Sequence, residues 1–395
     1  MKKCSLMLAA AVAGVAALAD PFGAPPNATH AWGVHDDNRP GVKKISAPLG
    51  QIPSDAIVLF DGTKDSVEKN WCDKNGKPTK WTVDDAGDLI SVKGAGYIFT
   101  KEKFADCQLH VEWASPKTVK GMGQGRGNSG VFLMGNYEIQ VLDSYETDPD
   151  APGGNKNPNY SDGQAGAIYG QNPPLVNPCR APGEFNSYDI VFHPPKFDAD
   201  GKVLEPATIT LFFNGVLVQD GWKYDGPTGY RKRSTYGRVK GDTGLARSDR
   251  MPLAFQDHGN PVHYRNVWIR EIPRPSDNVT HGDYYAKPEA VLAQRAETAA
   301  KLDAAFDEVW ANEPLGRRLV EAWRICSYEK TPSRMNRVKK LEREYLAAIK
   351  GMKRKDDIRK FGPGERELKF YFTNLVNFGV MEKEDPVLAA INALK

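Results

Sequence analysis

The chain has 395 residues, with 53 Lys and Arg against 50 Asp and Glu, and 40% of its residues are hydrophobic. This nearly neutral composition is typical of a globular protein, and it excludes both a disordered chain and a dedicated nucleic-acid binder that relies on net charge. The 37 Gly and 28 Pro predict a turn-rich, mainly β architecture over much of the length.

Residues 1–19 have the pattern of a secretory signal peptide. Lys2 and Lys3 precede a short apolar run, and Ala17-Leu18-Ala19 has the small residues of a cleavage site. The run is too short to span a bilayer, and no later segment reaches the ~18 consecutive apolar residues of a membrane helix. We therefore expect a periplasmic or secreted protein without a membrane span. Residues 20–54, rich in Pro and Gly, are expected to form an extended leader.

Short strands with turns between them are predicted over residues 55–272. Apolar and polar side chains alternate from Cys107 to Trp113, as in a strand with one buried face. Asn214-Gly215 between two apolar runs predicts a type I′ hairpin turn, and Gly135-Asn136 predicts another hairpin. A series of such strands is typical of a two-sheet sandwich.

Two long irregular stretches interrupt the strand series. Residues 144–184 are dense in Gly, Pro and Asn, and loops of this length in compact domains commonly act as lids or binding loops. The second stretch, residues 221–250, carries eight Lys or Arg and three Asp.

Helical spacing of apolar residues replaces the strand pattern after Pro273. We expect residues 283–395 to form an α-helical region, because prolines fall near the predicted helix starts, where they are tolerated. The predicted helices cover residues 288–311, 314–328, 332–349 and 365–378.

The segment Glu138–Asp143 is the first candidate site. Glu138 and Gln140 project from the same face of a strand, and Asp143 joins them only if a bulge shifts the phase. Carboxylates and amides aligned on a sheet face are how β-sandwich enzymes that act on glycans build a site. The pattern departs from the E-x-D-x-x-E strand of retaining endoglucanases, because Gln140 replaces the Asp and Asp143 the second Glu. A solvated strand face is the alternative for Glu138.

The turn Gln256–Asn260 is the second candidate. Asp257 beside His258 could tune the imidazole to act as acid or base near neutral pH. The same side chains could instead bind a divalent cation. A turn whose polar side chains cap their own backbone explains the pattern equally well.

Eight motifs, in order along residues 55–272, together resemble one family. They are Leu59-Phe-Asp-Gly62, Trp81-Thr-Val83, Gly127-Asn-Ser-Gly-Val131, Tyr137-Glu-Ile-Gln-Val-Leu-Asp143, Gly166-Ala-Ile-Tyr-Gly170, Pro182-Gly-Glu-Phe185, Phe213-Asn-Gly-Val216 and Gln256-Asp-His-Gly-Asn260 with Tyr264-Arg-Asn-Val-Trp-Ile269. The set is similar to the 3-keto-disaccharide hydrolase family. The resemblance implies a concanavalin-like lectin or glucanase jelly roll that acts on glycosides whose C3 hydroxyl is oxidised to a ketone; the helical region lies outside it.

A 3-keto-sugar substrate implies roles for the candidate residues. The ketone acidifies the proton on C2, and a base removes it before the C1 substituent leaves. Glu138 or His258 is the expected base, with Asp257 orienting His258. Gln140, Arg265 or a divalent metal such as Ca, Mg or Mn is expected to hold the enolate oxygen.

Further residues are expected to bind the substrate, an oligosaccharide or another glycoside. The expected substrate-binding residues are Gln140, Gln256, Arg265, Asn128 and Tyr169. A metal, if one is used, is expected on Glu138, Asp143 and His258. Two alternatives remain open: a non-catalytic carbohydrate-binding module and an ordinary endoglycosidase.

Overall fold

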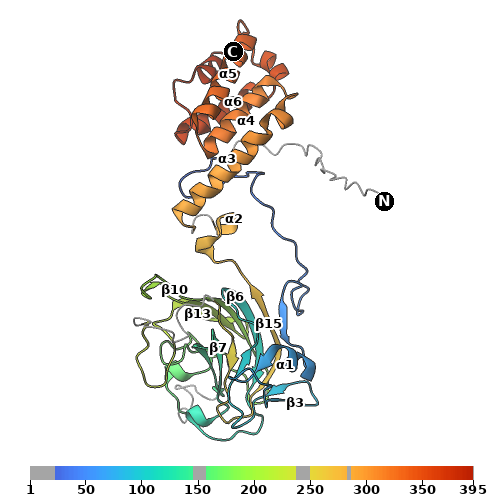
Figure 1. Ribbon diagram of the computed structural model, residues 1–395, viewed down its shortest axis with the longest axis vertical. Coiled ribbons are helices and arrows are strands. Elements are labelled where there is room, and N and C mark those ends of the chain that lie inside the picture. The colour runs from blue at the N-terminus through green and yellow to red at the C-terminus, as the bar shows by residue number, and fades with distance from the viewer. Residues whose placement is uncertain (1–22, 146–156, 237–249, 283–285, 395) are drawn as a thin grey trace, which may run out of the picture. The chain divides into compact units, whose positions relative to one another are not determined.

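The computed structural model describes residues 23–145, 157–236, 250–282 and 286–394, and the predicted signal peptide lies outside these ranges. The chain divides into two compact units (Figure 1). One, the β unit, is Lys44–Arg274, and the other, the helical unit, combines residues before Lys44 with those from Pro275 onward.

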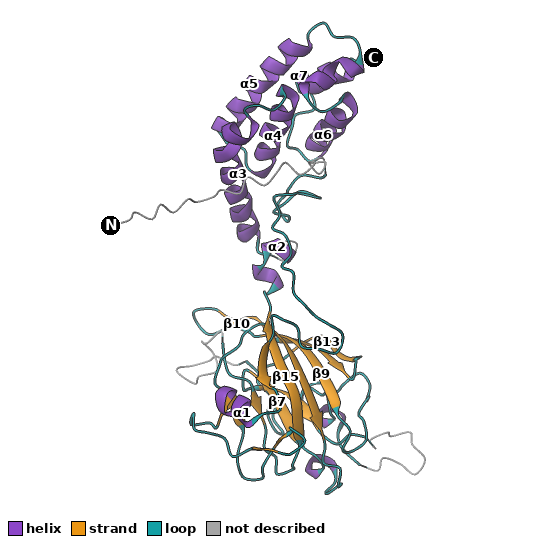
Figure 2. Cartoon of the chain, turned by 90° about the vertical axis from the view of Figure 1, so that its right-hand side faces the viewer, coloured by secondary structure: helices purple, strands orange, loops and turns teal. Residues whose placement is uncertain are grey.

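The larger sheet of the β unit contains eight described strands, all paired antiparallel. Figure 2 shows this sheet, with β9, β13 and β15 labelled. Seven lie in the order β13 (Val216–Lys223), β12 (Thr208–Phe213), β9 (Asn186–His193), β6 (Cys107–Ala114), β15 (His263–Glu271), β4 (Leu89–Ile90) and β3 (Thr82–Val83). The eighth, β1 (Ile57–Phe60), pairs with β15.

The smaller sheet contains five described strands, also antiparallel. Their order is β2 (Trp71–Cys72), β5 (Ile98–Thr100), β14 (Ala254–Phe255), β7 (Ser129–Leu133) and β8 (Tyr137–Val141). The β unit also contains a ribbon of β10 (Lys196–Phe197) and β11 (Val203–Glu205), helix α1 (Lys64–Asn70) and the 3-10 turns η1 (Gly123–Gly125) and η2 (Ser161–Gly163).

The two sheets pack face to face around one apolar core. Tyr264 of β15 stacks on Phe255 of β14 with ring centroids 4.4 Å apart, and its hydroxyl donates to Ser129 Oγ at 2.6 Å. Tyr188 of β9 likewise donates across the interface to the Gln140 carbonyl at 2.7 Å. The predicted mainly-β sandwich, with a helical C-terminal region, is confirmed.

Strand phase and turns follow the sequence pattern closely. Along β6, Cys107, Leu109, Val111 and Trp113 are buried, whereas the residues between them are half-buried. Asn214 and Gly215 both have positive φ, 52° and 78°, as a type I′ turn requires.

The predicted hairpin between β7 and β8 is present, and Gly135 and Asn136 both lie in its loop. Leu133 pairs with Tyr137, so three residues form the loop, and Met134 and Gly135 have positive φ, 52° and 65°. Met134 and Gly135 are therefore the two central residues of the turn. Asn136 instead closes the loop, because its backbone N–H donates to the Leu133 carbonyl at 3.1 Å.

Helices make up most of the second unit. Their bounds are α2 (Val279–Gly282), α3 (Pro288–Trp310), α4 (Leu315–Tyr328), α5 (Pro332–Ile349), α6 (Glu365–Asn377) and α7 (Pro386–Asn392), with 3-10 turns η3 (Pro275–Asp277) and η5 (Lys355–Phe361). The four predicted helices correspond to α3, α4, α5 and α6, and proline stands at the start of α3 and α5. In the described chain no helix is both long and apolar enough to cross a membrane.

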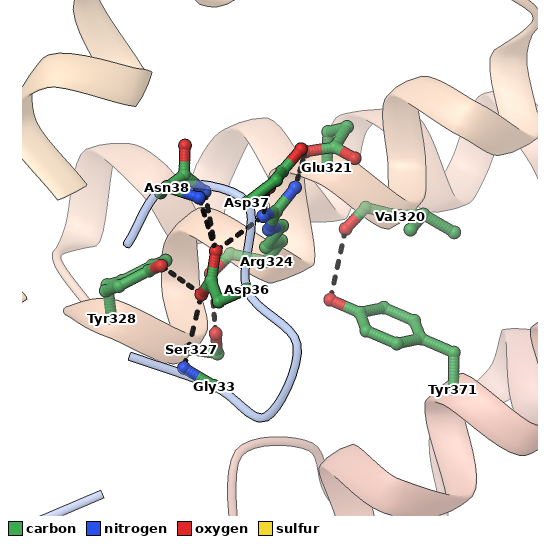
Figure 3. Close-up of polar contacts among 10 residues, drawn as sticks. All are labelled: Gly33, Asp36, Asp37, Asn38, Val320, Glu321, Arg324, Ser327, Tyr328 and Tyr371. Atoms are coloured by element: carbon green, nitrogen blue, oxygen red, sulfur yellow. Dashed lines mark hydrogen bonds and ion pairs between the residues drawn. The ribbon is translucent and has the colours of Figure 1, made fainter. Parts of the chain in front are cut away.

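Residues 23–43 pack into this helical unit through Asp36 (Figure 3). The Asp36 carboxylate accepts hydrogen bonds from Arg324 Nη2 of α4 at 2.7 Å and from the Tyr328 hydroxyl. Trp32 is buried in the same apolar core as α4. The predicted leader, residues 20–54, is thus not one separate segment: its described part is shared between the two units, with the division after Lys43.

Candidate active site

A pocket of about 390 Å³ lies against the smaller sheet of the β unit. Six of the sequence-predicted site residues line it together: Glu138, Gln140, Asn128, Tyr169, Gln256 and His258. The other lining residues are Tyr97, Gln124, Phe132, Thr228, Gly229 and Tyr230. The β8 segment and the turn after β14 therefore contribute to one hollow.

Strand alternation on β8 turns Glu138 and Gln140 toward the pocket. Their neighbours Tyr137, Ile139 and Val141 belong to the core between the sheets. Both polar side chains are nevertheless buried, with exposed fractions of 6% and 1%. Glu138 and Gln140 thus lie on the predicted face, but they do not form a solvated surface.

The Glu138 carboxyl group is buried without a compensating partner. Among the described residues, none forms a hydrogen bond or ion pair with its carboxylate. Burial alone raises the pKa of Glu138 to about 8, because a charged carboxylate is poorly solvated there. A carboxyl group with a raised pKa, in a pocket, is a typical sign of a functional acid or base.

Gly130 of β7 leaves room for the Glu138 side chain. A Cβ atom at Gly130 would lie 2.5 Å from Glu138 Oε1 and 2.8 Å from a ring carbon of Phe132. Any larger residue here would displace the carboxyl group. Gly130 therefore determines where this group lies.

The segment 166–169 extends the smaller sheet beside β8 and positions Tyr169. The backbone N–H of Gln140 donates to the Ala167 carbonyl at 3.0 Å, and the N–H of Gly166 donates to the Gln140 carbonyl at 3.0 Å. Tyr169 follows, and its hydroxyl lies 2.8 Å from the Tyr160 hydroxyl. On β8, the backbone N–H of Glu138 donates to Thr228 Oγ1 at 3.1 Å, and this bond holds the loop that contains Thr228 at the pocket.

A chain of side-chain amides fixes one wall of the pocket. Gln140 Nε2 donates to Asn128 Oδ1 at 3.0 Å and to the Val141 carbonyl at 3.0 Å. Asn128 Nδ2 in turn donates to Gln124 Oε1 at 2.9 Å and to its carbonyl at 2.7 Å. The Nδ2 and Nε2 donors are already engaged, so this wall is rigid and preorganised.

Tyr97 and Gln256 form a second polar pair in the pocket. Gln256 Nε2 donates to the Tyr97 hydroxyl at 2.6 Å, so the phenolic proton of Tyr97 remains available to a ligand. Burial raises the pKa of Tyr97 despite the hydrogen bond from Gln256, which keeps the phenol protonated. Gln256 Oε1 is buried and has no hydrogen-bond partner among the described residues. Tyr97 was not predicted as a site residue, because nothing in its local sequence distinguishes it.

His258 and Asp257 do not form the expected pair. His258 lines the pocket and is exposed to solvent. The Asp257 carboxylate instead accepts backbone N–H donors from Gly96 at 3.0 Å and Gly259 at 2.8 Å. Asp257 thus stabilises its own turn, and this geometry gives no support to its predicted role in orienting His258.

Arg265 lies on the wrong face of the sandwich for its predicted roles. Its neighbour Tyr264 points between the sheets, so alternation places Arg265 on the outer face of the larger sheet. There its Nε donates to Glu112 Oε2 at 2.6 Å, and its guanidinium stacks 3.7 Å above the Phe185 ring. Arg265 therefore contributes neither to substrate binding nor to an enolate site in the pocket.

Asp143 is also separate from Glu138. β8 ends at Val141, and the Asp143 carboxylate receives the Arg126 Nε donor at 2.6 Å, with both side chains buried. The predicted metal set of Glu138, Asp143 and His258 is therefore not assembled. Within the described ranges, the only His, Cys, Asp and Glu residues that cluster closely enough to share an ion are Asp84, Asp88 and His263, and His263 is not among the residues that line the pocket.

One protein family accounts for most of the β unit. The model of the 3-keto-alpha-glucoside-1,2-lyase-like domain matches residues 55–270, more than half of the chain. The chain belongs to this family. The predicted resemblance, and its limits of residues 55–272, agree with the match. No curated protein matches the chain.

Two of the solved structures similar to the chain come from Parabacteroides distasonis and are described as candidate glycosyl hydrolases. The first is 39% identical, with a TM-score of 0.50, and the match covers 59% of this chain and 92% of that one. A second is 21% identical, with a TM-score of 0.37, over 55% of this chain and 94% of its own. The first match supports the fold assigned to the β unit of this family member.

Proposed function

We propose that the pocket cleaves 3-keto-glycosides, with Glu138 removing the proton from C2 of the sugar. The observation that carries this proposal is the buried, unpartnered Glu138 carboxyl with its raised pKa. A carboxylate that binds its proton more tightly than usual is a stronger base, matched to proton abstraction near pH 8. Membership of the family and the similarity to a candidate glycosyl hydrolase support a glycoside as the substrate.

The chemistry needs few groups. Glu138 takes the C2 proton, the electron pair forms an enolate with the C3 ketone, and the C1–O bond then breaks. A C1=C2 double bond forms, the ketone is restored, and the departing oxygen takes up a proton. Addition of water across the double bond would complete a hydrolysis, whereas release of the unsaturated sugar would make the enzyme a lyase.

Two further side chains of the pocket fit the remaining roles. Tyr97, whose hydroxyl accepts from Gln256 and keeps its own proton, is the group that we assign to donate to the enolate oxygen. His258, exposed at the pocket, is a group that can exchange a proton with the departing oxygen and with water. The vacant acceptor Gln256 Oε1 would take a hydrogen bond from a sugar hydroxyl.

The carboxyl count argues against an ordinary retaining endoglycosidase. That mechanism uses two carboxyl groups ~5–5.5 Å apart. Glu138 is the only acidic residue among the described residues that line the pocket. Elimination from a 3-keto sugar needs one base and no carboxylate nucleophile, which agrees better with this set.

The experiment compares matched substrates and variants. Wild type, Glu138→Gln and Tyr97→Phe are incubated with a 3-keto-glucoside and with its unoxidised parent, with and without a chelator. We expect wild type to cleave only the keto compound, Glu138→Gln to bind without cleaving it, and Tyr97→Phe to retain reduced turnover. Cleavage of the unoxidised parent alone would refute the keto-sugar proposal. Binding of both sugars by the wild type, without cleavage of either, would indicate a carbohydrate-binding module.

A further inference from the structure

A second pocket, of about 410 Å³, adjoins the first. Tyr169, Gly229 and Tyr230 line both pockets, so the two hollows share a wall of aromatic residues. The second pocket adds Tyr160 and the consecutive cations Arg231, Lys232 and Arg233. Its aromatic and basic lining differs from the amide wall beside Glu138.

The aromatic surfaces of this second pocket are open to a ligand. Tyr230 and Tyr160 are exposed by 61% and 44%, so both rings are accessible to a ligand. The Arg231 guanidinium lies 5.0 Å from the centroid of the Tyr230 ring, so a cation adjoins this aromatic surface. Arg231 also has a φ of 55°, a left-handed backbone that few side chains adopt.

The charge of the second pocket is positive. Arg231, Lys232 and Arg233 are all exposed, and none forms an ion pair with another described residue. One carboxylate, Asp162, shares the lining, so the three cations outnumber it. Guanidinium groups bind carboxylate and phosphate oxygens through parallel hydrogen bonds.

We propose that this second pocket receives the leaving group and selects an aromatic aglycone that bears an anionic group. The inference rests on the proposed function, since it places the sugar beside Glu138 and its C1 substituent across the shared wall of Tyr169 and Tyr230. The ring of the aglycone would stack on tyrosine, while its anionic group meets Arg231 or Arg233. The subsite thus specifies the substrate class of the reaction.

The test uses two 3-keto-glucosides of nearly equal size, a 4-carboxyphenyl and a 4-carbamoylphenyl compound. Wild type should favour the carboxylate by roughly fivefold in kcat/KM, as expected for an ion pair near solvent. The double variant Arg231→Gln/Arg233→Gln should bring this ratio close to one. The control Lys223→Gln, an exposed cation on β13, removes a charge outside the pocket and should leave the ratio unchanged.

Calorimetric binding of the two unoxidised aryl glucosides separates this inference from the proposed function. Preferred binding of the carboxylate by wild type, lost in the double variant, would support the subsite even if no keto compound were cleaved. Cleavage of both keto compounds with equal kcat/KM, together with equal binding of both parents, would overturn the subsite and leave the proposed function standing. A ratio that persists in the double variant would also overturn it.

Discussion

Glu138 is the one acidic side chain among the described residues that line the pocket, and the proposed reaction depends on it. Its side chain is buried in the wall of the pocket, and no described residue forms an ion pair or a hydrogen bond with its carboxylate. Folding therefore confines a group that would be ionised in water at neutral pH to a site where ionisation is costly. Such an arrangement weakens the fold locally and strengthens the base.

The pH dependence of activity follows from the pKa of Glu138. A base is active only when deprotonated, and burial raises this pKa to about 8. We expect kcat/KM on a 3-keto-glucoside to rise with pH, to reach half of its maximum near pH 8 and to level off at higher pH. A rate that is already constant from pH 5 upward would contradict the assignment of Glu138 as the base.

The raised pKa of Glu138 should also make the folded protein less stable as the pH rises. Between pH 4.5 and 8 the folded state keeps the Glu138 proton, whereas the unfolded state releases it, so the free energy of unfolding falls as pH rises. The Glu138→Gln variant lacks this carboxyl group, so its free energy of unfolding should not fall for this reason. Above pH 8 the variant should be more stable than wild type, by up to about 5 kcal/mol. Denaturant unfolding at several pH values measures the difference, and parallel curves for the two proteins would argue against a buried, unpaired carboxyl.

Strand alternation made one part of the site predictable and another part not. The period of two correctly placed Glu138 and Gln140 on one face of β8. The same rule excludes Arg265, but only once Tyr264 is known to face inward. Asp143 lies beyond the end of β8, and its partner Arg126 belongs to another segment. Tyr97 joins through the fold alone, so local patterns contain no sign of it.

Gly130 offers a test at the level of the β7–β8 pair. Gly130→Ala places a methyl group where the Glu138 carboxyl lies, and a misplaced base should lower kcat/KM on the order of 100-fold. Gly125→Ala is the matched control, because a Cβ there meets nothing within 4 Å. Circular dichroism checks that both variants fold. Unchanged turnover in folded Gly130→Ala would mean that the position of Glu138 is not critical.

The arrangement of the whole chain differs from the predicted linear order of leader, sandwich and helices. The spacing of apolar residues predicted the strands of the sandwich and four of the helices, because strands and helices are set by residues close in sequence. They did not show that residues 23–43 belong with the helices. That assignment depends on Asp36 and Arg324, which lie 288 positions apart. The β unit is therefore inserted between two segments of one helical unit.

Asp36→Ala tests whether the N-terminal segment stabilises the helical unit. Burial opposes ionisation, yet Arg324 and Tyr328 lower the pKa of Asp36, so it is a charged partner of a buried guanidinium. Its loss should destabilise this unit by about 3 kcal/mol. Thermal unfolding followed by far-ultraviolet circular dichroism measures the effect, with exposed Asp307→Ala on α3 as control. Equal melting of the two variants would mean that the segment is dispensable.

Proton abstraction from C2 is the central claim, and a deuterium isotope effect tests it most directly. The rate of cleavage is measured for a 3-keto-glucoside deuterated at C2 and, as the matched control, for the same compound deuterated at C1. We predict a several-fold slower kcat/KM for the C2-deuterated substrate, little change for the C1-deuterated one, and no turnover in Glu138→Gln. Equal rates for the C2-deuterated and unlabelled substrates, with undiminished cleavage by Glu138→Gln, would contradict this mechanism.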